Sequence, residues 1–528
     1  MRNLNEIKMK TLKKINSNSY LVTALLLLLT LSYSSCTEDL DKTPLNIVTS
    51  DKQFNGLDGY KQGLVSIYSN LAYSRFLRFH WSMQEYSTDM AVSTWNDGGD
   101  GIYHELAWSA DSPAIANVYN AALGMITLCN NYVNEASTES VIARGFSDAE
   151  AEEIAQFKAE TRFLRAYCFW ILMDAYGNPP FPTENTLGTT APTQIQRADL
   201  FTFIEKELKE IDPLLANART NERGRPDKAS AWALLSRMYL NGKIYTGQEY
   251  YTDAVTYSNK IINSGYSLES KYEWLMLGDN DLNTNEFIFT INYDNTNETW
   301  YSTNFLALGP AGVPASINGM SDSWLAFRFT QQIPALFPTT NMSVDKRAQF
   351  YTNGQDLEVS SVTTSTDGYS GFKYRNVRRD GSPMEQNNTF GNLSDIDFPV
   401  FRLAEIYLTY AEAVLRGGAG GSKTEALTYI NKIRGRAYDD NPLSTDGNIT
   451  DTALTLDFIL DERARELYWE AQRRTDLIRY NKFTTGDYLW AWKGNAESGR
   501  AVDDKFNLFP IPTSDLLANP NLEQIDGF

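Results

Sequence analysis

Residues 150–181 read EAEEIAQFKAETRFLRAYCFWILMDAYGNPPF, and this stretch decides the fold. From Phe163 to Met173 nearly every position is apolar, so no single stripe of the helix faces a core. A helix that is apolar all round packs against neighbours on several sides. Gly177, Asn178 and the two prolines that follow are a helix stop signal. We therefore expect a central helix that is surrounded by other helices.

Apolar residues at helical spacing recur on both sides of this stretch. Successive hairpins of such helices, each needing a neighbour to cover it, are typical of an α-solenoid, although no fixed 34-residue tetratricopeptide period is present. In the last segment, Asp461 and Arg465, and Glu470 and Arg474, are spaced four apart, which would pair them on one long helix. The further predicted helices cover residues 56–79, 113–136, 199–215, 227–242, 250–265, 401–418, 423–437 and 456–483.

The region from residue 277 to residue 397 differs from its surroundings. It is rich in Asn, Thr, Ser, Gly and aromatic residues, with short β-like runs at 286–292 and 371–377. A region this long without long helices is functional or disordered, and its regular spread of aromatic residues argues against disorder. We expect a mostly α-helical domain over residues 56–528. Its scaffold of tetratricopeptide-like hairpins covers 56–276 and 398–528, and an irregular, loop-rich cap with short β elements covers 277–397.

The first 35 residues predict an export signal. Five basic residues precede YLVTALLLLLTL at 20–31, which is too short to span a bilayer but suits a signal-peptide core. Two serines directly precede Cys36, as in a bacterial lipobox. We expect residues 1–35 to be removed, Cys36 to be lipidated and residues 36–55 to form a tether. The alternative is an ordinary cleaved signal with Cys36 incidental.

Composition excludes several classes of function. The net charge of −19 argues against a nucleic-acid partner, because neutralising phosphates requires clustered Lys and Arg. The chain has only two histidines, His80 and His104, which makes histidine-based catalysis or a histidine-rich metal site a poor fit. After lipidation only Cys129 and Cys168 remain, both in predicted helices, so a disulfide scaffold is excluded.

Six segments, in order along the chain, resemble the SusD/RagB family of surface glycan-binding lipoproteins. They read AETRFLRAYCFWILMDAYGNPPF, GRPDKASAWALLSRMYL, FRLAEIYLTYAEAVLR, INKIRGRA, DERARELYWEAQRRTDLIRYNKF and LFPIPTSDLLANPNL. The resemblance implies a helical body with four tetratricopeptide-like hairpins and an irregular half that carries the ligand site. The acidic TEDLDKTP after Cys36 resembles the signal that sends lipoproteins of glycan-degrading Gram-negative bacteria to the outer face of the outer membrane.

The resemblance also implies a function. Family members capture an oligosaccharide outside the cell and deliver it to a SusC-type TonB-dependent transporter, on which they act as a lid. The segments DFPVFRLAEIYLTYAEAVLRGG, YTNGQDLEV and TDGYSGFKYRNV look closest to the family's starch-binding member, which favours an α-glucan. The alternatives are another glycan or a peptide ligand, and the loop tryptophans argue against the peptide.

The starch-binding member holds its ligand on an arc of two tryptophans and a tyrosine, with arginine and asparagine side chains bonding to hydroxyls. By resemblance, Trp95 is the candidate for the first tryptophan, because it lies in the polar, glycine-flanked loop STWNDGG. Arg78 is the candidate for the arginine, and Asn96 and Asp97 are adjacent acceptors. Packing for Trp95 and a solvated helix charge for Arg78 are the alternatives.

Trp324, in GMSDSWLAF, is the candidate for the second tryptophan. The choice between Tyr293 and Tyr301 for the tyrosine stays open, and Trp300 competes with both. We interpret three other tryptophans as core residues, namely Trp108, Trp170 and Trp469.

Two other site chemistries can be weighed from the sequence. A glycoside hydrolase would need a pair of carboxylates at a suitable separation, and no feature marks out one pair among the many acids. We therefore expect no enzyme activity and no cofactor. The run GDNDLNTNE offers Asp279, Asp281 and Glu286 as ligands for a structural calcium ion, but it lacks the spacing of an EF-hand, which favours a solvated acidic turn.

Overall fold

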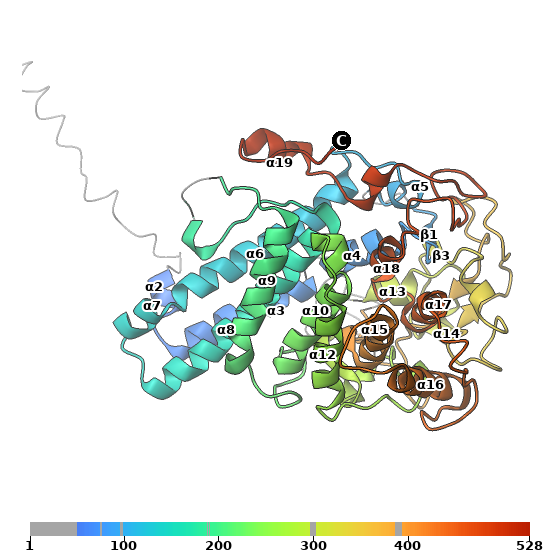
Figure 1. Ribbon diagram of the computed structural model, residues 1–528, viewed down its shortest axis with the longest axis horizontal. Coiled ribbons are helices and arrows are strands. Elements are labelled where there is room, and N and C mark those ends of the chain that lie inside the picture. Colours follow the sequence, from blue (N-terminus) through green and yellow to red (C-terminus); the bar gives the residue numbers. More distant parts are fainter. Residues whose placement is uncertain are drawn as a thin grey trace, which may run out of the picture. The chain divides into compact units, whose positions relative to one another are not determined.

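The computed structural model describes residues 50–73, 76–95, 99–186, 188, 191–295, 303–385 and 393–528. By its contacts the chain divides into two units, Met1–Asn55 and Gly56–Phe528. In the first unit one short helix is described, α2 (Ser50–Gln53). Cys36, the expected signal peptide and most of the expected tether lie outside the described residues. The second unit contains all the other described elements (Figure 1).

The unit Gly56–Phe528 is mostly helical, as predicted. Among the described residues, no helix has both the length and the apolar character needed to cross a membrane. Its α-helices are α3 (Leu57–Tyr73), α4 (Phe76–Glu85), α5 (Ile102–Glu105), α6 (Pro113–Glu135), α7 (Thr138–Ala143), α8 (Asp148–Tyr176), α9 (Arg197–Ile211), α10 (Lys228–Leu240), α11 (Gly242–Thr246), α12 (Tyr251–Ile262), α13 (Asn304–Leu308), α14 (Ala315–Asn318), α15 (Leu403–Leu415), α16 (Lys423–Asp439), α17 (Leu456–Leu467), α18 (Arg473–Arg479) and α19 (Thr513–Ala518).

The strands are short and pair in twos. In the described part of the chain there are three pairs, all antiparallel: β1 with β3, β2 with β6, and β4 with β5. The strands are β1 (Val92–Ser93), β2 (Phe287–Ile291), β3 (Phe327–Arg328), β4 (Phe350–Tyr351), β5 (Ser370–Gly371) and β6 (Phe398–Arg402).

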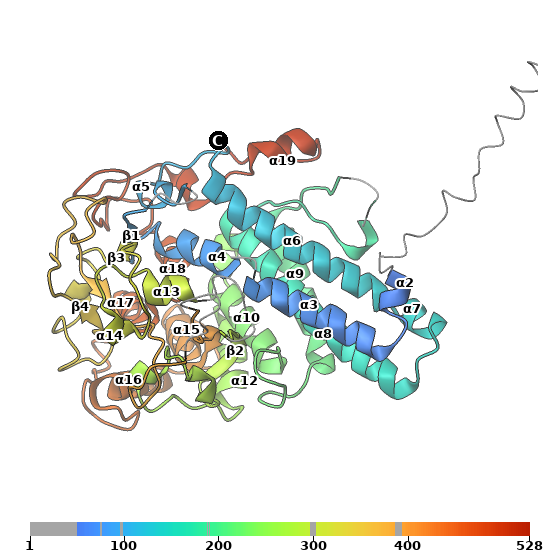
Figure 2. The ribbon, with the colours of Figure 1, turned by 180° about the vertical axis from the view of Figure 1, so that it is seen from behind.

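Helix α8 is the centre of the first helical block, as predicted. Every residue from Phe163 to Tyr176 is buried, and α8 packs against α3, α6 and α9. Figure 2 shows α3, α6 and α8 lying alongside one another. The helix starts at Asp148 because the Ser147 hydroxyl accepts the N–H of Glu150, while the Glu150 carboxylate accepts the N–H of Ser147 at 2.9 Å. It stops at Gly177, whose φ of +70° suits a glycine.

The two predicted halves of the scaffold form one body. Helix α12, which precedes the cap, packs against both α10 and α15, and α15 follows the cap. Helix α15 also packs against α16 and α17. Strand β2 leaves the first block and pairs with β6, which enters the second, so that Ile291 lies opposite Phe398. The cap is therefore a long excursion whose two ends lie side by side. The predicted helix from Phe401 starts later, at Leu403, because β6 takes its first residues.

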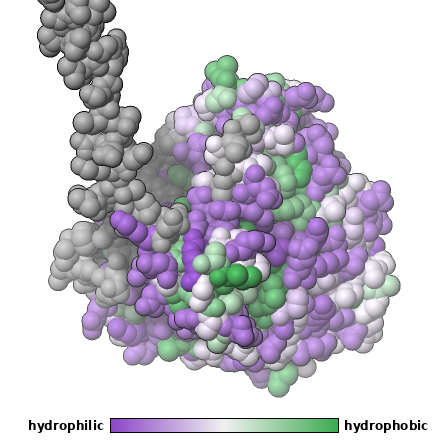
Figure 3. Space-filling model, turned by 90° about the vertical axis from the view of Figure 1, so that its left-hand side faces the viewer, coloured by the Kyte–Doolittle hydropathy of each residue, from purple (hydrophilic) through white to green (hydrophobic). Residues whose placement is uncertain are grey.

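The surface of the unit shows no large continuous apolar face in the view of Figure 3. Most of it is hydrophilic, with separate hydrophobic patches. Among the described residues, the two most exposed large apolar side chains are Leu517 and Leu443, at 83% and 82%. Single exposed apolar residues of this kind are normal on a protein surface.

The prediction of one long helix over 456–483 is wrong. The chain breaks between α17 and α18, where Trp469 and Ala471 adopt left-handed backbone angles with φ of +61° and +60°. Side chains from distant segments fill the break. Trp81 and Tyr374 donate hydrogen bonds to the carbonyl of Trp469 at 3.0 and 2.9 Å, and the ring of Phe329 stacks on Trp469 at 4.3 Å.

The expected pairs along that helix do not form either. Glu470 forms ion pairs with Arg402 at 2.7 Å and with Lys373 at 2.5 Å, and not with Arg474. Arg465 binds Glu462 at 2.8 Å. These contacts belong to a set of buried charges between β2, β6, the cap and α17, which we call the buried ion network. Its members are Glu286, Asp345, Arg347, Lys373, Arg402, Arg436, Glu462, Glu466 and Glu470.

Arg402 lies at the centre of the buried ion network. Its side chain is 1% exposed, and it binds Glu286 at 2.9 Å, Glu466 at 2.7 Å and Glu470 at 2.7 Å. Burial alone would raise the pKa of Glu466, but the guanidinium groups of Arg436 and Arg402 outweigh it and hold the pKa below its usual value. The network joins the cap to the second half of the scaffold, residues 398–528, through buried charges.

Glu85, at the end of α4, is a buried acid of a different kind. It is 0% exposed, and one carboxyl oxygen accepts the N–H of Gln472 at 3.3 Å. The other oxygen has no hydrogen-bond partner within the described residues. Burial, with a smaller contribution from the nearby Asp89, raises the pKa of Glu85 to about 8. Glu85 is therefore mostly protonated in the folded protein at neutral pH.

This protonation predicts a pH dependence of stability. The unfolded chain loses the Glu85 proton near pH 4.5 and the folded protein only near pH 8, so stability falls as the pH rises between these values. The loss between pH 5 and pH 8 is on the order of 2–4 kcal/mol. We expect Glu85→Gln to flatten this slope and to raise the stability at pH 8, measured by urea unfolding at several pH values. Parallel curves for the two proteins would contradict the assignment.

Candidate functional site

Strands β1 and β3 bring two distant loops together. Val92 lies opposite Arg328, and Ser93 lies opposite Phe327. The pairing continues beyond the strands, because the N–H of Thr94 donates to the carbonyl of Ala326 at 2.7 Å. The loop that follows β1 therefore runs beside the loop that precedes β3. The sequence predicted neither strand.

The buried side chain of Arg328, in β3, ties this strand pair to residues 361–367 by hydrogen bonds. It is 0% exposed and donates to the carbonyl oxygens of Asp367 at 2.7 Å and Ser361 at 3.3 Å. Burial lowers the pKa of Arg328 to about 10, which leaves it charged at neutral pH. Because its partners are main-chain carbonyls, Arg328 holds the position of the loops without neutralising its charge.

Trp95 and Trp324 meet at the end of the strand pair. Their ring centroids are 5.8 Å apart, and their planes are inclined by 28°. Trp95 is 36% exposed and Trp324 is partly exposed. The N–H of Trp324 donates to the carbonyl of Leu308 at 2.6 Å, and the N–H of Trp95 donates to the Ser93 hydroxyl at 3.1 Å. We call these two rings the tryptophan platform. Its two members are the two tryptophans that the sequence singled out for the ligand.

Two charged side chains, Arg78 and Asp100, lie beside the tryptophan platform. Arg78, from α4, and Asp100 line the same small pocket as the two rings, and their side chains approach to 3.5 Å. Both are partly shielded, with side-chain exposures of 13% and 11%. The pocket encloses only about 10 Å³, which is room for one water molecule. A ligand therefore rests on this site and does not enter it.

Of the other predicted ligand residues, only Tyr293 is described, and it lies away from the tryptophan platform. Tyr293 is 6% exposed, its N–H donates to Asp397 at 2.9 Å, and it does not line the pocket of the tryptophan platform. Four candidates lie outside the described residues, namely Asn96, Asp97, Trp300 and Tyr301. Sequence reasoning missed Asp100 and Ser93. The one available signal was their position in the same glycine-rich loop as Trp95.

The candidate calcium ligands do not come together. Glu286 is 0% exposed and binds Arg402 at 2.9 Å and Arg436 at 3.1 Å, so it belongs to the buried ion network and not to a solvated turn. Asp279 accepts the N–H of Arg379 at 2.9 Å. In the described ranges, no three His, Cys, Asp or Glu side chains lie close enough to share a metal ion. The expectation of a solvated acidic turn is wrong for Glu286.

The residues that we interpreted as core residues are buried. Trp108, Trp170 and Trp469 are 2%, 1% and 0% exposed. Cys129 and Cys168 are both buried free thiols, and burial raises the pKa of each.

Comparison with known proteins gives the family. Residues 339–528 match the family described as "SusD family", and residues 40–240 match one described as "Starch-binding associating with outer membrane". The chain is 31% identical to the starch-binding protein SusD of Bacteroides thetaiotaomicron, over 96% of this chain and 98% of that protein. This chain belongs to the SusD family. It is accordingly a surface glycan-binding protein of a non-catalytic family that associates with the outer membrane.

Solved SusD-like structures share the fold. A SusD homologue from Bacteroides thetaiotaomicron superposes with a TM-score of 0.73 at 17% identity, covering 91% of this chain and 98% of that one. Surface glycan-binding protein A from the same species, in complex with laminarihexaose, gives a TM-score of 0.66 at 19% identity, covering 88% and 99%. The mostly helical body with an irregular cap is therefore the fold of the SusD family.

Proposed function

We propose that this SusD-family protein captures an α-glucan of the starch type on the tryptophan platform. In this proposal a lipid on Cys36 anchors it to the outer face of the outer membrane, and it passes the glycan to a SusC-type TonB-dependent transporter. The observation that carries the ligand part is the pair of solvent-accessible indole rings, inclined by 28°, beside Arg78 and Asp100. The starch-binding relative, at 31% identity, supports the choice of glycan.

The platform suits stacking against sugar rings. Each ring that covers an indole face removes roughly 50–100 Å² of apolar surface from water, which contributes about 1–2.5 kcal/mol. Two such contacts give only weak binding once the cost of association is subtracted, so we expect dissociation constants from micromolar to millimolar. Weak binding suits a protein that hands its ligand on.

The geometry of the platform favours a curved chain. The two ring planes are inclined by 28°, so a chain that stacks on both rings has to bend between them. An α-1,4-linked glucose chain curves in solution, whereas a β-1,4-linked chain runs straight and turns alternate faces to one side. Arg78 and Asp100, beside the rings, supply a hydrogen-bond donor and an acceptor for hydroxyl groups. A curved glucan is therefore the ligand class that the platform fits best.

A panel of polysaccharides in native affinity gels tests the ligand. We expect soluble starch to retard the protein, and maltoheptaose in solution to release it, while straight β-1,4-glucans leave its migration unchanged. Serum albumin serves as the reference for sieving. Retardation by the β-1,3-glucan laminarin alone would overturn the starch assignment and keep a curved glucan. No retardation by any member of the panel would overturn glycan capture by this platform.

The anchor is tested separately. We expect Cys36→Ala to release the protein from the outer-membrane fraction of the native host, since a single cysteine is the only acceptor for the lipid in this proposal. Retention of the variant in that fraction, with normal surface accessibility to protease, would contradict anchoring through Cys36.

A further inference from the structure

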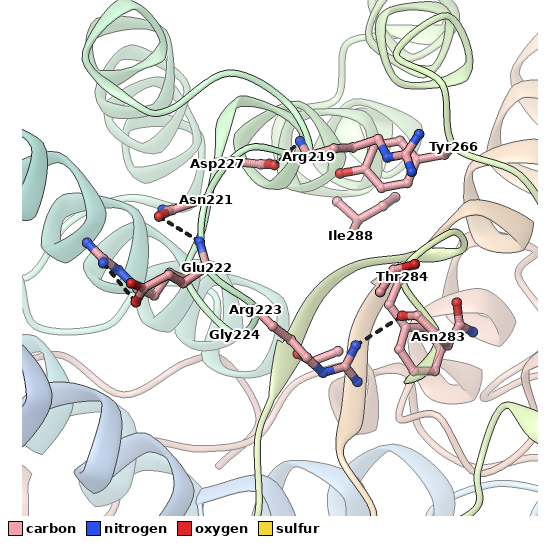
Figure 4. A pocket seen from close by; sticks show the side chains of 13 residues that line it. Arg219, Asn221, Glu222, Arg223, Gly224, Asp227, Tyr266, Asn283, Thr284 and Ile288 are labelled. Atoms are coloured by element: carbon pink, nitrogen blue, oxygen red, sulfur yellow. Dashed lines mark hydrogen bonds and ion pairs between the residues drawn. The ribbon is translucent and has the colours of Figure 1, made fainter. Parts of the chain in front are cut away.

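A second cavity lies where the connection between α9 and α10 faces β2 (Figure 4). Its volume is about 290 Å³, and it shares no lining residue with the pocket of the tryptophan platform. This volume is near the lower end of small-molecule sites, which begin at roughly 300 Å³. The cavity can therefore hold one small ring, while the pocket beside the tryptophans cannot.

Tyr266 carries a polar group into this cavity without a protein partner. The residue is 8% exposed, and its side chain reaches toward the open centre beside Ile288 (Figure 4). No residue in the described part of the chain makes a hydrogen bond with its hydroxyl. The hydroxyl can therefore bond to a water molecule or to a ligand.

Arg219 is held over Tyr266 by a strained backbone. Its φ is +66°, a left-handed angle that is unfavourable for a residue other than glycine. Its N–H donates to Asp227 at 2.6 Å, its guanidinium donates to the carbonyl of Gly265, and the guanidinium carbon lies 5.5 Å from the centre of the Tyr266 ring. Strain of this kind is retained mainly where it positions a functional group.

Arg219 differs from the other two arginines of the cavity. Arg223 binds Asp397 at 2.8 Å, and Arg225 binds Glu160 at 2.7 Å, so both are paired with carboxylates that lie outside the cavity lining. Among the described residues, no carboxylate forms an ion pair with the Arg219 side chain. Its remaining N–H groups are therefore available as donors.

The cavity walls combine donors, acceptors and apolar surface. Arg219, Tyr266 and Thr284 supply donors, and Glu222 supplies a carboxylate whose side chain is 80% exposed. Ile288, which is 7% exposed, supplies a small apolar patch between Tyr266 and Thr284 (Figure 4). This mixture matches a ring that carries hydroxyl groups on its edge and C–H groups on its face. It matches an anion less well, because Glu222 and the buried Asp227 line the same space.

We propose that this cavity is a second carbohydrate site, which binds one neutral sugar residue by its hydroxyl groups. The proposal takes the sugar class from the family and does not depend on the tryptophan platform. Because Arg219 covers one face of Tyr266, recognition here rests on hydrogen bonds and not on stacking. The site is therefore selective for the stereochemistry of a single ring and indifferent to the curvature of a chain.

The test removes the platform first. In the Trp95→Ala, Trp324→Ala background, methyl α-D-glucoside is titrated and followed by saturation-transfer NMR. We expect saturable binding with a millimolar dissociation constant. Tyr266→Phe, added to this background, should weaken it about threefold to tenfold by removing one hydrogen bond. Tyr429→Phe is the matched control, because its partly exposed hydroxyl lies on α16 outside the cavity and should not matter.

Three results would overturn the second site. These are the absence of saturable binding by the platform-free protein, equal binding by the Tyr266→Phe and Tyr429→Phe proteins, and binding of glucuronate without binding of the neutral glucoside. Thr284→Trp, which adds a large ring to the lining of the cavity, is a further check and should remove the signal. Failure of the starch panel with retained glucoside binding would instead contradict only the tryptophan platform.

Discussion

The Trp95→Ala, Trp324→Ala double variant is expected to migrate through a starch-containing native gel as if no starch were present. Each indole face contributes about 1–2.5 kcal/mol to stacking, so losing both removes roughly 2–5 kcal/mol. This corresponds to a weakening of roughly thirtyfold to several thousandfold. For a protein that binds in the micromolar to millimolar range, such a loss leaves no measurable retardation.

The single variants should lose more than half of the effect each. The two rings lie against one another at 5.8 Å, so removing one also frees the other to turn away from its position. Residues in contact of this kind rarely have additive effects. We therefore expect a coupling between the two substitutions in isothermal titration with maltoheptaose.

Stability separates loss of the site from loss of the fold. Trp95 is 36% exposed and Trp324 is partly exposed, so the double variant should melt within a few degrees of the parent. Trp274→Ala is the matched control, because Trp274 is also partly exposed but does not line the platform pocket. It should bind starch normally. Undiminished retardation of the double variant would place the starch site elsewhere.

Arg402→Met is expected to destabilise the protein by at least about 3–5 kcal/mol, the usual effect of breaking a buried ion pair by removing one partner. Arg402 forms ion pairs with Glu286, Glu466 and Glu470. The side chains of these three glutamates are at most 2% exposed. Without the guanidinium, these carboxylates remain out of water with less compensating charge. Urea unfolding at pH 7 measures the loss.

Two further variants show whether a loss of stability comes from the buried ion pairs of Arg402. Arg402→Lys keeps the charge but loses the planar fork, so it should fall between the parent and Arg402→Met. Lys423→Gln removes an exposed partner of Asp451, an ion pair whose side chains are 41% and 62% exposed, and should change stability by less than about 1 kcal/mol. If Arg402→Met were as mild as Lys423→Gln, the buried ion network would not hold the cap to the scaffold.

The helices that the sequence predicted well have local causes. The central helix α8 follows from an apolar run, a serine cap and a glycine stop, all within a few residues of its ends. The break after α17 was not predictable in this way. Its left-handed residues are held by Trp81, Phe329 and Tyr374, which lie far away in the sequence. No periodic pattern carries that information.

The candidate site also divides into features that the local sequence predicts and features that depend on distant contacts. The family resemblance, together with the polar, glycine-flanked loop around Trp95, singled out Trp95 and Trp324, and the two rings lie close together in the structure. The sequence contains only one signal for Asp100, its place in the same loop as Trp95, because the contact between Asp100 and Arg78 depends on how that loop returns to α4. Glu286 was misread for a similar reason. In sequence it looks like the end of an acidic turn, and in space it faces two arginines of the second helical block.

The antiparallel pairing of β1 with β3 has a consequence for folding during synthesis. Thr94 and Leu325, which hydrogen-bond next to the two tryptophans, are 231 residues apart in the chain. A chain that emerges from its N-terminus therefore carries Trp95 long before the partner ring exists. The platform can form only after β3 and Trp324 have been made and β3 has paired with β1.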